Sequence, residues 1–171
     1  MHSVQFTRFL VGAILAVFTL VPAMPTRAAA PHIERFYNEG ADLHLLDCGT
    51  FFVNGQFREA VTVTTFLDEA GTPVQLKVHV MFDGQLTNEA TGTTLRDTSR
   101  ETRFIDVHTG VENVVGLPWQ WVIPEVGRVL LDAGNIVFDP GTGEVLFEAG
   151  RHPRFYMTDS EIDALICSAL A

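Results

Sequence analysis

The stretch of sequence that decides the fold is Ala60–Phe82, which reads AVTVTTFLDEAGTPVQLKVHVMF. Its first seven residues are rich in β-branched side chains, which favour β-strands. From Val74 to Phe82 every second residue is Val, Leu or Phe, so this segment predicts a half-buried strand with one face on the core. A turn sequence, DEAGTP at 68–73, separates the two segments, and we therefore expect a β-hairpin. Asp83-Gly84 follows directly and predicts the next turn.

The same pattern of short strands and turns continues towards the C-terminus. Further strands are predicted at 103–107, 117–123, 126–132, 135–138 and 145–148. Turns this short can join only antiparallel strands, because a parallel connection needs a long crossover. Pro118 has no backbone N–H, so its strand is expected at a sheet edge or with an irregular step.

One helix is predicted, at 158–170. Thr158 and Glu161 have the spacing of a capping box at its start. An apolar stripe at helical spacing follows, made of Ile162, Leu165, Ile166 and Leu170. The segment 33–46 fits a short helix and an irregular first strand equally well.

These elements predict a mainly β protein, an antiparallel sandwich or a small barrel of roughly six to nine strands with one C-terminal helix. Of the two architectures we favour the barrel. No internal repeat, low-complexity tract or linker follows residue 31. Residues 31–171 are therefore expected to form a single antiparallel β domain, with its terminal helix at 158–170.

The first thirty residues have the order of a secretory signal peptide. A short start with the positive charge of Arg8 precedes the apolar run 9–21, and small residues follow up to Ala30. The apolar run is shorter than the roughly 20 residues of a membrane-spanning helix. Residues 1–30 therefore predict a cleaved leader and a secreted, extracellular protein. The alternatives are a periplasmic location and a membrane tether formed by an uncleaved leader.

The two cysteines, Cys48 and Cys167, lie near the two ends of the predicted domain. In an oxidising compartment, two cysteines without a third predict one disulfide. A bridge that closes so long a loop stabilises the folded state by roughly 4–5 kcal/mol in chain-entropy terms. Buried free thiols are the alternative. A catalytic cysteine is disfavoured, because a disulfide would use both sulfurs.

The composition is acidic and argues against polyanionic partners. The chain has 11 basic and 21 acidic residues; without Arg8 and Arg27 of the leader, 9 basic residues remain and the net charge is −12 with neutral histidines. A nucleic acid or an anionic membrane surface is a poor partner for such a chain. No segment after the leader is apolar enough for stable membrane insertion.

Five histidines follow the leader, and their spacing does not point to a metal or cofactor site. No two of them lie three to five residues apart, which is the spacing of a local zinc pair. We therefore expect no metal and no cofactor. His108 and Asp106 are two residues apart, which on a strand places both side chains on one face. They are the candidate catalytic pair, an acid–base histidine oriented by a carboxylate. A turn residue that bonds its neighbour is the simpler interpretation.

Trp119 and Trp121 are the candidate ligand-binding residues. They are also two residues apart, so their rings are expected to point the same way. On the core face they would be ordinary packing. On an exposed face or in a barrel mouth they would form a platform for a lipid, a sugar ring or a partner protein.

Four motifs carry a resemblance to known proteins. They are DCG at 47–49, TNEATG at 87–92, LLDAG at 130–134 and FDPGTGEVLFEAG at 138–150. Together they resemble a group of small exported bacterial β-rich proteins of unknown function, over most of the chain after the leader. The resemblance implies export, an early and a late cysteine, and a β-rich domain. It implies no activity and no catalytic residue.

From these observations we expect a secreted, non-catalytic binding protein. Its ligand is expected to be a small apolar molecule held in a barrel mouth near Trp119 and Trp121. One alternative is a β-barrel enzyme, an isomerase or hydrolase, that uses His108 and Asp106. The other is an extracellular module that docks a partner protein.

Overall fold

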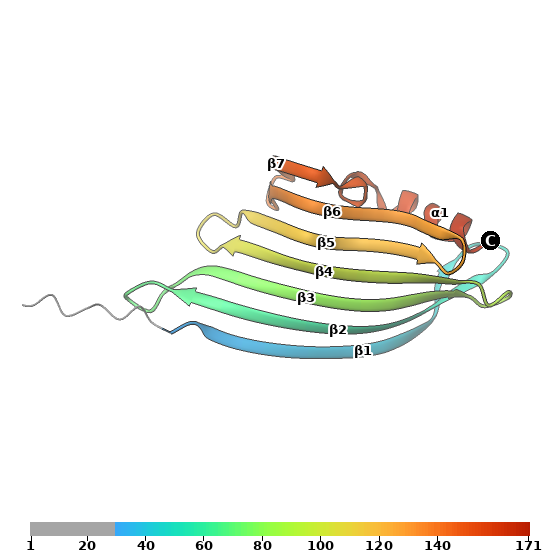
Figure 1. Ribbon diagram of the computed structural model, residues 1–171, viewed down its shortest axis with the longest axis horizontal. Coiled ribbons are helices and arrows are strands. Elements are labelled where there is room, and N and C mark those ends of the chain that lie inside the picture. The colour runs from blue at the N-terminus through green and yellow to red at the C-terminus, as the bar shows by residue number, and fades with distance from the viewer. Residues whose placement is uncertain (1–29) are drawn as a thin grey trace, which may run out of the picture.

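The computed structural model describes residues 30–171, so the predicted leader lies outside the described residues apart from Ala30. Seven strands form one antiparallel sheet, in which each strand pairs with the next along the chain (Figure 1). In chain order they are β1 (His32–Asp47), β2 (Phe52–Leu67), β3 (Pro73–Asn88), β4 (Thr94–Asp106), β5 (Glu112–Ile123), β6 (Gly127–Asp139) and β7 (Glu144–Arg151). A short 3-10 helix, η1 (Pro153–Tyr156), and the helix α1 (Asp159–Leu170) follow.

The sheet is open, because its edge strands β1 and β7 do not pair with each other anywhere in residues 30–171. The expected mainly β, antiparallel fold with one C-terminal helix is confirmed, but the favoured closed barrel is not formed. The second layer is α1, which lies over one end of one face of the sheet (Figure 1). We call the face that packs against α1 the inner face, and the opposite face the outer face.

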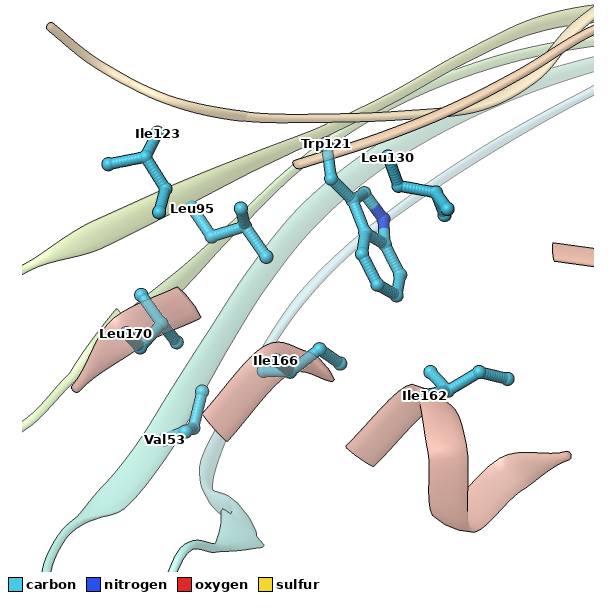
Figure 2. Close-up of a cluster of buried hydrophobic side chains, with 8 residues drawn as sticks. All are labelled: Val53, Leu95, Trp121, Ile123, Leu130, Ile162, Ile166 and Leu170. Atoms are coloured by element: carbon cyan, nitrogen blue, oxygen red, sulfur yellow. The ribbon is translucent and has the colours of Figure 1, made fainter. Parts of the chain in front are cut away.

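The core lies between the inner face and α1 (Figure 2). Its buried members are Val53 of β2, Leu95 of β4, Trp121 and Ile123 of β5, Leu130 of β6, and Ile162, Ile166 and Leu170 of α1. Burial of one such side chain contributes roughly 1.5–3 kcal/mol. This cluster therefore explains why the helix docks at this end of the sheet.

Both ends of α1 are fixed. At its start, the hydroxyl of Thr158 accepts a hydrogen bond from the backbone N–H of Glu161, and the Glu161 carboxylate accepts one from the backbone N–H of Thr158, which completes the expected capping box. Near its end, the Cys48–Cys167 disulfide is present, with the two Cα atoms 5.5 Å apart. The amide of Asn88 donates a hydrogen bond of 2.9 Å to the backbone carbonyl of Leu170.

Of the six hairpin turns in the described part of the chain, five begin with an Asp or Asn that caps the turn. In each, the side-chain Oδ1 accepts a hydrogen bond from the backbone N–H two residues further on. The five residues are Asp47, Asp68, Asn88, Asp106 and Asp139. This Asx turn satisfies backbone groups that leave the strand ladder, so it ends one strand and starts the reversal.

Several strands are longer than the sequence predicts. β3 continues through Asp83-Gly84, so the turn expected there is wrong, and β6 continues through Ala133-Gly134. The ambiguous segment 33–46 belongs to strand β1. Pro118 lies in β5, which has a neighbour on each side, and the register of β5 against β6 shifts between Gly116 and Trp119. Of the two expectations for this strand, the irregular step is the one observed.

Candidate functional site

Beyond α1, the inner face of β2, β3 and β4 carries apolar side chains that remain only half-buried. The strand register places Val61 opposite Val80, and Phe82 and Ile105 lie on the same face. These residues, together with Val78, form the apolar wall of a cavity of about 470 Å³ that extends to β5. We call this cavity the trough. Its volume falls in the range of small-molecule sites, roughly 300–1,000 Å³.

Glu101 of β4 is the most deeply buried charged side chain of the trough, with 4% of its surface exposed. Arg103 donates from Nε to Glu101 Oε1 over 2.7 Å, and its Nη2 lies at the same distance from that oxygen. The second oxygen, Oε2, is buried without a hydrogen-bond partner among the described residues. Opposite Glu101 on β5 is Gly116, which has no side chain. Glu101 therefore lines the trough with a buried carboxylate that is only half satisfied.

Asp97, also on β4, lies where the trough meets a second cavity of about 250 Å³ beside α1. Burial raises the pKa of Asp97 to about 6, and the nearby indole of Trp121 and the guanidinium of Arg154 offset only part of this rise. No hydrogen bond of good geometry joins Asp97 to Trp121, and Asp97 Oδ1 and Trp121 Nε1 are both buried without a partner within residues 30–171. A carboxyl group held in this way ionises near neutral pH.

Two further carboxylates, Glu59 of β2 and Glu112 of β5, complete the polar lining. The guanidinium of Arg103 lies 3.8 Å from Glu112 Oε2 and so bridges Glu101 and Glu112. The trough thus combines an apolar wall, mainly on β2 and β3, with an acidic border formed by carboxylates of β2, β4 and β5. That combination suits an amphipathic molecule better than a purely apolar one.

The two tryptophans lie in different surroundings. Trp121 is 4% exposed and packs in the core under α1. Trp119 lines the trough, and the guanidinium of Arg154 lies over its ring at 5.1 Å from the centroid. Of the two candidate ligand-binding residues, the trough therefore includes Trp119, whereas Trp121 borders the smaller cavity beside the helix.

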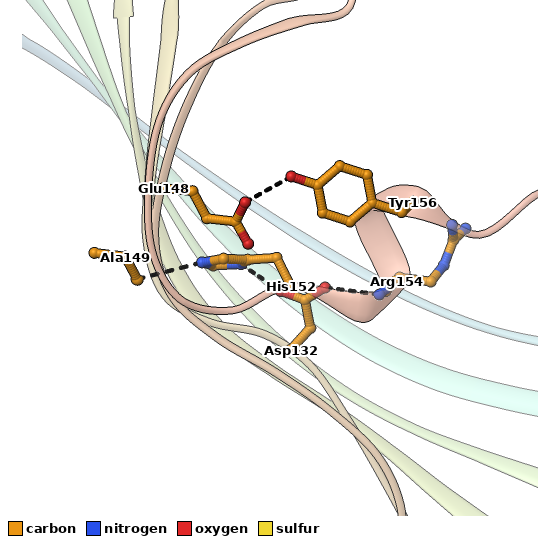
Figure 3. Close-up of polar contacts among 6 residues, drawn as sticks. All are labelled: Asp132, Glu148, Ala149, His152, Arg154 and Tyr156. Atoms are coloured by element: carbon orange, nitrogen blue, oxygen red, sulfur yellow. Dashed lines mark hydrogen bonds and ion pairs between the residues drawn. The ribbon is translucent and has the colours of Figure 1, made fainter.

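A buried Asp132–His152 pair is the strongest polar contact that sequence reasoning missed (Figure 3). His152 Nδ1 lies 2.8 Å from Asp132 Oδ1, and both side chains are 1% exposed. The backbone N–H of Arg154 donates to Asp132 Oδ2 over 3.1 Å. Burial raises the pKa of Asp132, and the contact with His152 offsets part of that rise. The pair links β6 to the start of η1, directly after β7, and its role is structural.

The structure brings the candidate catalytic pair, Asp106 and His108, together in a turn. Asp106 ends β4, His108 lies in the following turn, and both are exposed. Asp106 Oδ1 accepts hydrogen bonds from the backbone N–H groups of His108 and Thr109. Hydrogen bonding by Thr109 is the main reason why the pKa of Asp106 is lowered. Neither residue lines the trough or the cavity beside α1. The geometry agrees with the simpler interpretation, a turn residue that bonds its neighbour.

The outer face has a hollow of its own, about 620 Å³, lined mainly by charged and amide side chains. Within it, Arg58 lies between Glu39 and Asp83 in the strand register, and Arg100 nearby donates to Asp83 over 2.8 Å. The Arg100–Asp83 contact is a cross-strand ion pair on a solvated surface, a kind of contact that contributes little. The trough, with its buried and unsatisfied groups, is the better candidate.

The sequence contains a pattern that indicates Asp97 and Glu101, although the strand predicted here, 103–107, does not include them. In the stretch 94–106, TLRDTSRETRFID, Leu95 and Ile105 lie an even number of residues apart, and Asp97, Ser99, Glu101 and Arg103 occupy the alternate positions between them. A strand that places polar residues on a face that is otherwise apolar indicates a polar lining of a cavity.

No group of three or more potential metal ligands lies together within residues 30–171. In the same part of the chain, no helix has the length and apolar character needed to span a membrane. Comparisons with protein-family models, with curated proteins and with solved structures found no match for this chain.

Proposed function

We propose that the protein is a secreted binding protein that holds a small, largely apolar molecule in the trough. The observation that carries the proposal is the apolar wall of Val61, Val78, Val80, Phe82 and Ile105, which α1 leaves uncovered. Binding is favourable because a ligand on this wall removes apolar surface from water on both partners, at roughly 25 cal/mol per Å². Secretion is supported by the leader pattern, and the disulfide is compatible with an oxidising compartment.

A catalytic role for His108 and Asp106 has less support. Asp106 already uses its carboxylate to accept backbone hydrogen bonds in the turn. General acid–base catalysis requires the histidine within hydrogen-bond reach of a bound substrate. The exposed turn offers no enclosed place for one.

The edge strand β1 favours a second candidate function, docking of an extracellular partner protein. Ile33, Tyr37 and Leu43 of β1 are each at least half exposed, at 50%, 62% and 79%. An unpaired strand edge with exposed apolar side chains can accept a strand from another protein. This candidate predicts that tryptophan fluorescence responds to a protein partner and not to lipid-like probes.

Substitution of Val80 tests the proposed function, with Met81 as the matched control on the same strand. Val80 lies on the trough wall, whereas Met81 faces outward and is 43% exposed. The neutral fluorescent probe N-phenyl-1-naphthylamine is expected to bind the wild-type protein. Val80→Asp should weaken that binding by at least about tenfold, because the probe would have to desolvate the new charge. Met81→Asp should leave it unchanged.

Circular dichroism spectra and thermal unfolding of both variants show whether the fold is retained. A wild-type protein that does not bind the probe, or two folded variants that bind it equally well, would contradict the proposal.

A further inference from the structure

An apolar ligand alone does not explain the acidic border of the trough. Four carboxylates line the cavity, those of Glu59, Asp97, Glu101 and Glu112. Among the described residues, Arg103 is the single cationic side chain of the lining. Arg154 does not line the cavity and lies over the ring of Trp119. Glu101 is buried and the other three are partly buried, and carboxylates removed from water are costly unless they are paired, so this excess requires a physical reason.

We infer that the molecule held in the trough carries a protonated amine, which binds Glu101 while the apolar part of the molecule lies on Val61, Val80 and Phe82. This inference rests on the proposed function and specifies the chemistry of its ligand.

Glu101 provides the first argument. Its side chain is more than nine-tenths buried and lines the trough, Arg103 occupies Oε1, and Oε2 has no partner within residues 30–171. An alkylammonium group has three N–H donors and a positive charge, so it can satisfy this oxygen with a charge-assisted hydrogen bond. A neutral apolar ligand brings no donor, so this oxygen would stay unsatisfied.

Asp97 and Glu112 provide the second argument, because their carboxylates make the site negatively charged. Asp97 Oδ1 is also buried without a partner in the described part of the chain, and Glu112 shares the guanidinium of Arg103 with Glu101. An anionic headgroup placed here would meet like charges, which costs free energy and discriminates against such a ligand. A cation meets complementary charge.

The strand register provides the third argument. Val61, Val80 and Glu101 are direct neighbours across β2, β3 and β4. Neighbouring strands lie roughly 4.8 Å apart, so an amine bound at Glu101 places the rest of the molecule across about 10 Å of apolar wall. On the other side, Gly116 of β5 offers no apolar side chain. A primary amine on a medium-length alkyl or aryl body fits this arrangement.

The test uses three probes of equal chain length, n-octylamine, 1-octanol and octanoate, titrated into the disulfide-bonded protein by calorimetry at pH 7.5 and low salt. The amine is expected to bind about tenfold more tightly than the alcohol, because it adds a charge-assisted hydrogen bond, and octanoate is expected to bind most weakly. Glu101→Gln should remove most of the preference for the amine and leave the affinity for the alcohol within about twofold.

Two further variants make the result specific. Glu112→Gln changes a less buried carboxylate, which is 18% exposed, and should reduce the same preference by a smaller factor. Glu144→Gln changes the charge equally at an exposed position outside the trough and should change nothing. If Glu101→Gln fails to fold, the wild-type preference and the Glu112→Gln variant decide the outcome.

The possible failures are distinguishable. Equal binding of the amine and the alcohol, or tighter binding of octanoate, would overturn the inferred amine while the proposed function stands. If none of the three probes binds and N-phenyl-1-naphthylamine does not bind either, the proposed function itself fails.

Discussion

Asp97 shows at the scale of one residue how the trough differs from the rest of the protein. Its carboxyl group is buried among Phe82 and Trp121, and burial raises its pKa to about 6. An ionised group without a hydrogen-bond partner destabilises the folded state, and an apolar residue here would avoid that cost. Side chains that destabilise the folded state are typical of functional sites.

The pH dependence of stability tests this interpretation through Asp97→Asn. The carboxyl group takes up its proton more readily in the folded state, so its contribution to stability is greatest below pH 4 and is lost as the pH rises through about 6. The asparagine variant should match the wild type near pH 4. At pH 7.5 it should be more stable, by at most about 3 kcal/mol for a shift of this size.

Urea unfolding followed by circular dichroism at the two pH values measures the difference. Asp163→Asn, on the exposed side of α1, is the control and should show no such change. A stability difference between Asp97→Asn and the wild type that is the same at both pH values would refute the argument.

Local spacing could predict pairs of residues only where the chain itself brings them together. The spacing of Asp106 and His108 is visible in the sequence, and the two do meet, in a turn. Asp132 and His152 are separated by 20 residues and meet because β7 returns beside β6. Without the strand register, nothing in the sequence distinguishes that pair from other combinations of acids and histidines.

At the scale of the elements, strand type and order could be predicted better than strand ends. Asp83-Gly84 and Ala133-Gly134 contain glycine and were interpreted as turns or breaks, yet both lie inside strands. The turns that do form after Asn88, Asp106 and Asp139 share a different pattern, an Asx residue with glycine four positions later. There the glycine N–H donates to the carbonyl of the Asx residue. Gly84 and Gly134 lack this arrangement, and their strands continue through them.

Three glycines of the sheet form a row across β5, β6 and β7, namely Gly116, Gly134 and Gly150. Gly134 has a φ of +138°, a conformation that side chains disfavour, and a Cβ atom there would overlap the backbone carbonyl oxygen of Ala149. The neighbouring backbones can therefore approach only because side chains are absent. Such a row allows the sheet to bend locally.

Replacement of Gly134 by alanine should destabilise the protein by at least about 2 kcal/mol, because strain and backbone overlap add together. Gly141→Ala is the matched control: Gly141 lies in an exposed turn, and its Cβ would meet only the side chain of Asp139, at 3.2 Å. That variant should remain within about 1 kcal/mol of the wild type. Thermal and urea unfolding measure both values, and equal losses would contradict the role of the glycine row.

At the scale of the whole molecule, the trough exists because the sheet is larger than the helix that covers it. The mainly β composition, the antiparallel order and the single terminal helix could all be predicted from alternation, turn sequences and the capping box. The open sheet could not, because closure depends on whether β1 and β7 meet, and no local pattern records that. The aromatic residues expected around a barrel mouth therefore divide between the core, as Trp121 does, and the trough, as Trp119 does.

The disulfide should contribute more to stability than any single side chain, because it links positions 119 residues apart. The Cys48→Ser, Cys167→Ser double variant should lose about 4–5 kcal/mol, mainly through the greater entropy of its unfolded chain. Its far-ultraviolet circular dichroism should stay close to that of the wild type, since the core beneath α1 does not require sulfur. Urea unfolding of the oxidised wild type and the variant measures the loss. A difference below about 1 kcal/mol would show that the bridge adds little to the packing.

The order of strands in the sheet also bears on how the molecule reaches this state. Within residues 30–171, every strand pairs only with its neighbours along the chain. Contacts of this kind close short loops, so hairpins can assemble one after another at low entropic cost. Docking of α1 is the exception, because it must bring the last turns of the chain against the β1–β2 connection. The meander therefore predicts a folding sequence in which the sheet forms hairpin by hairpin and the two thiols are oxidised late, after α1 has docked.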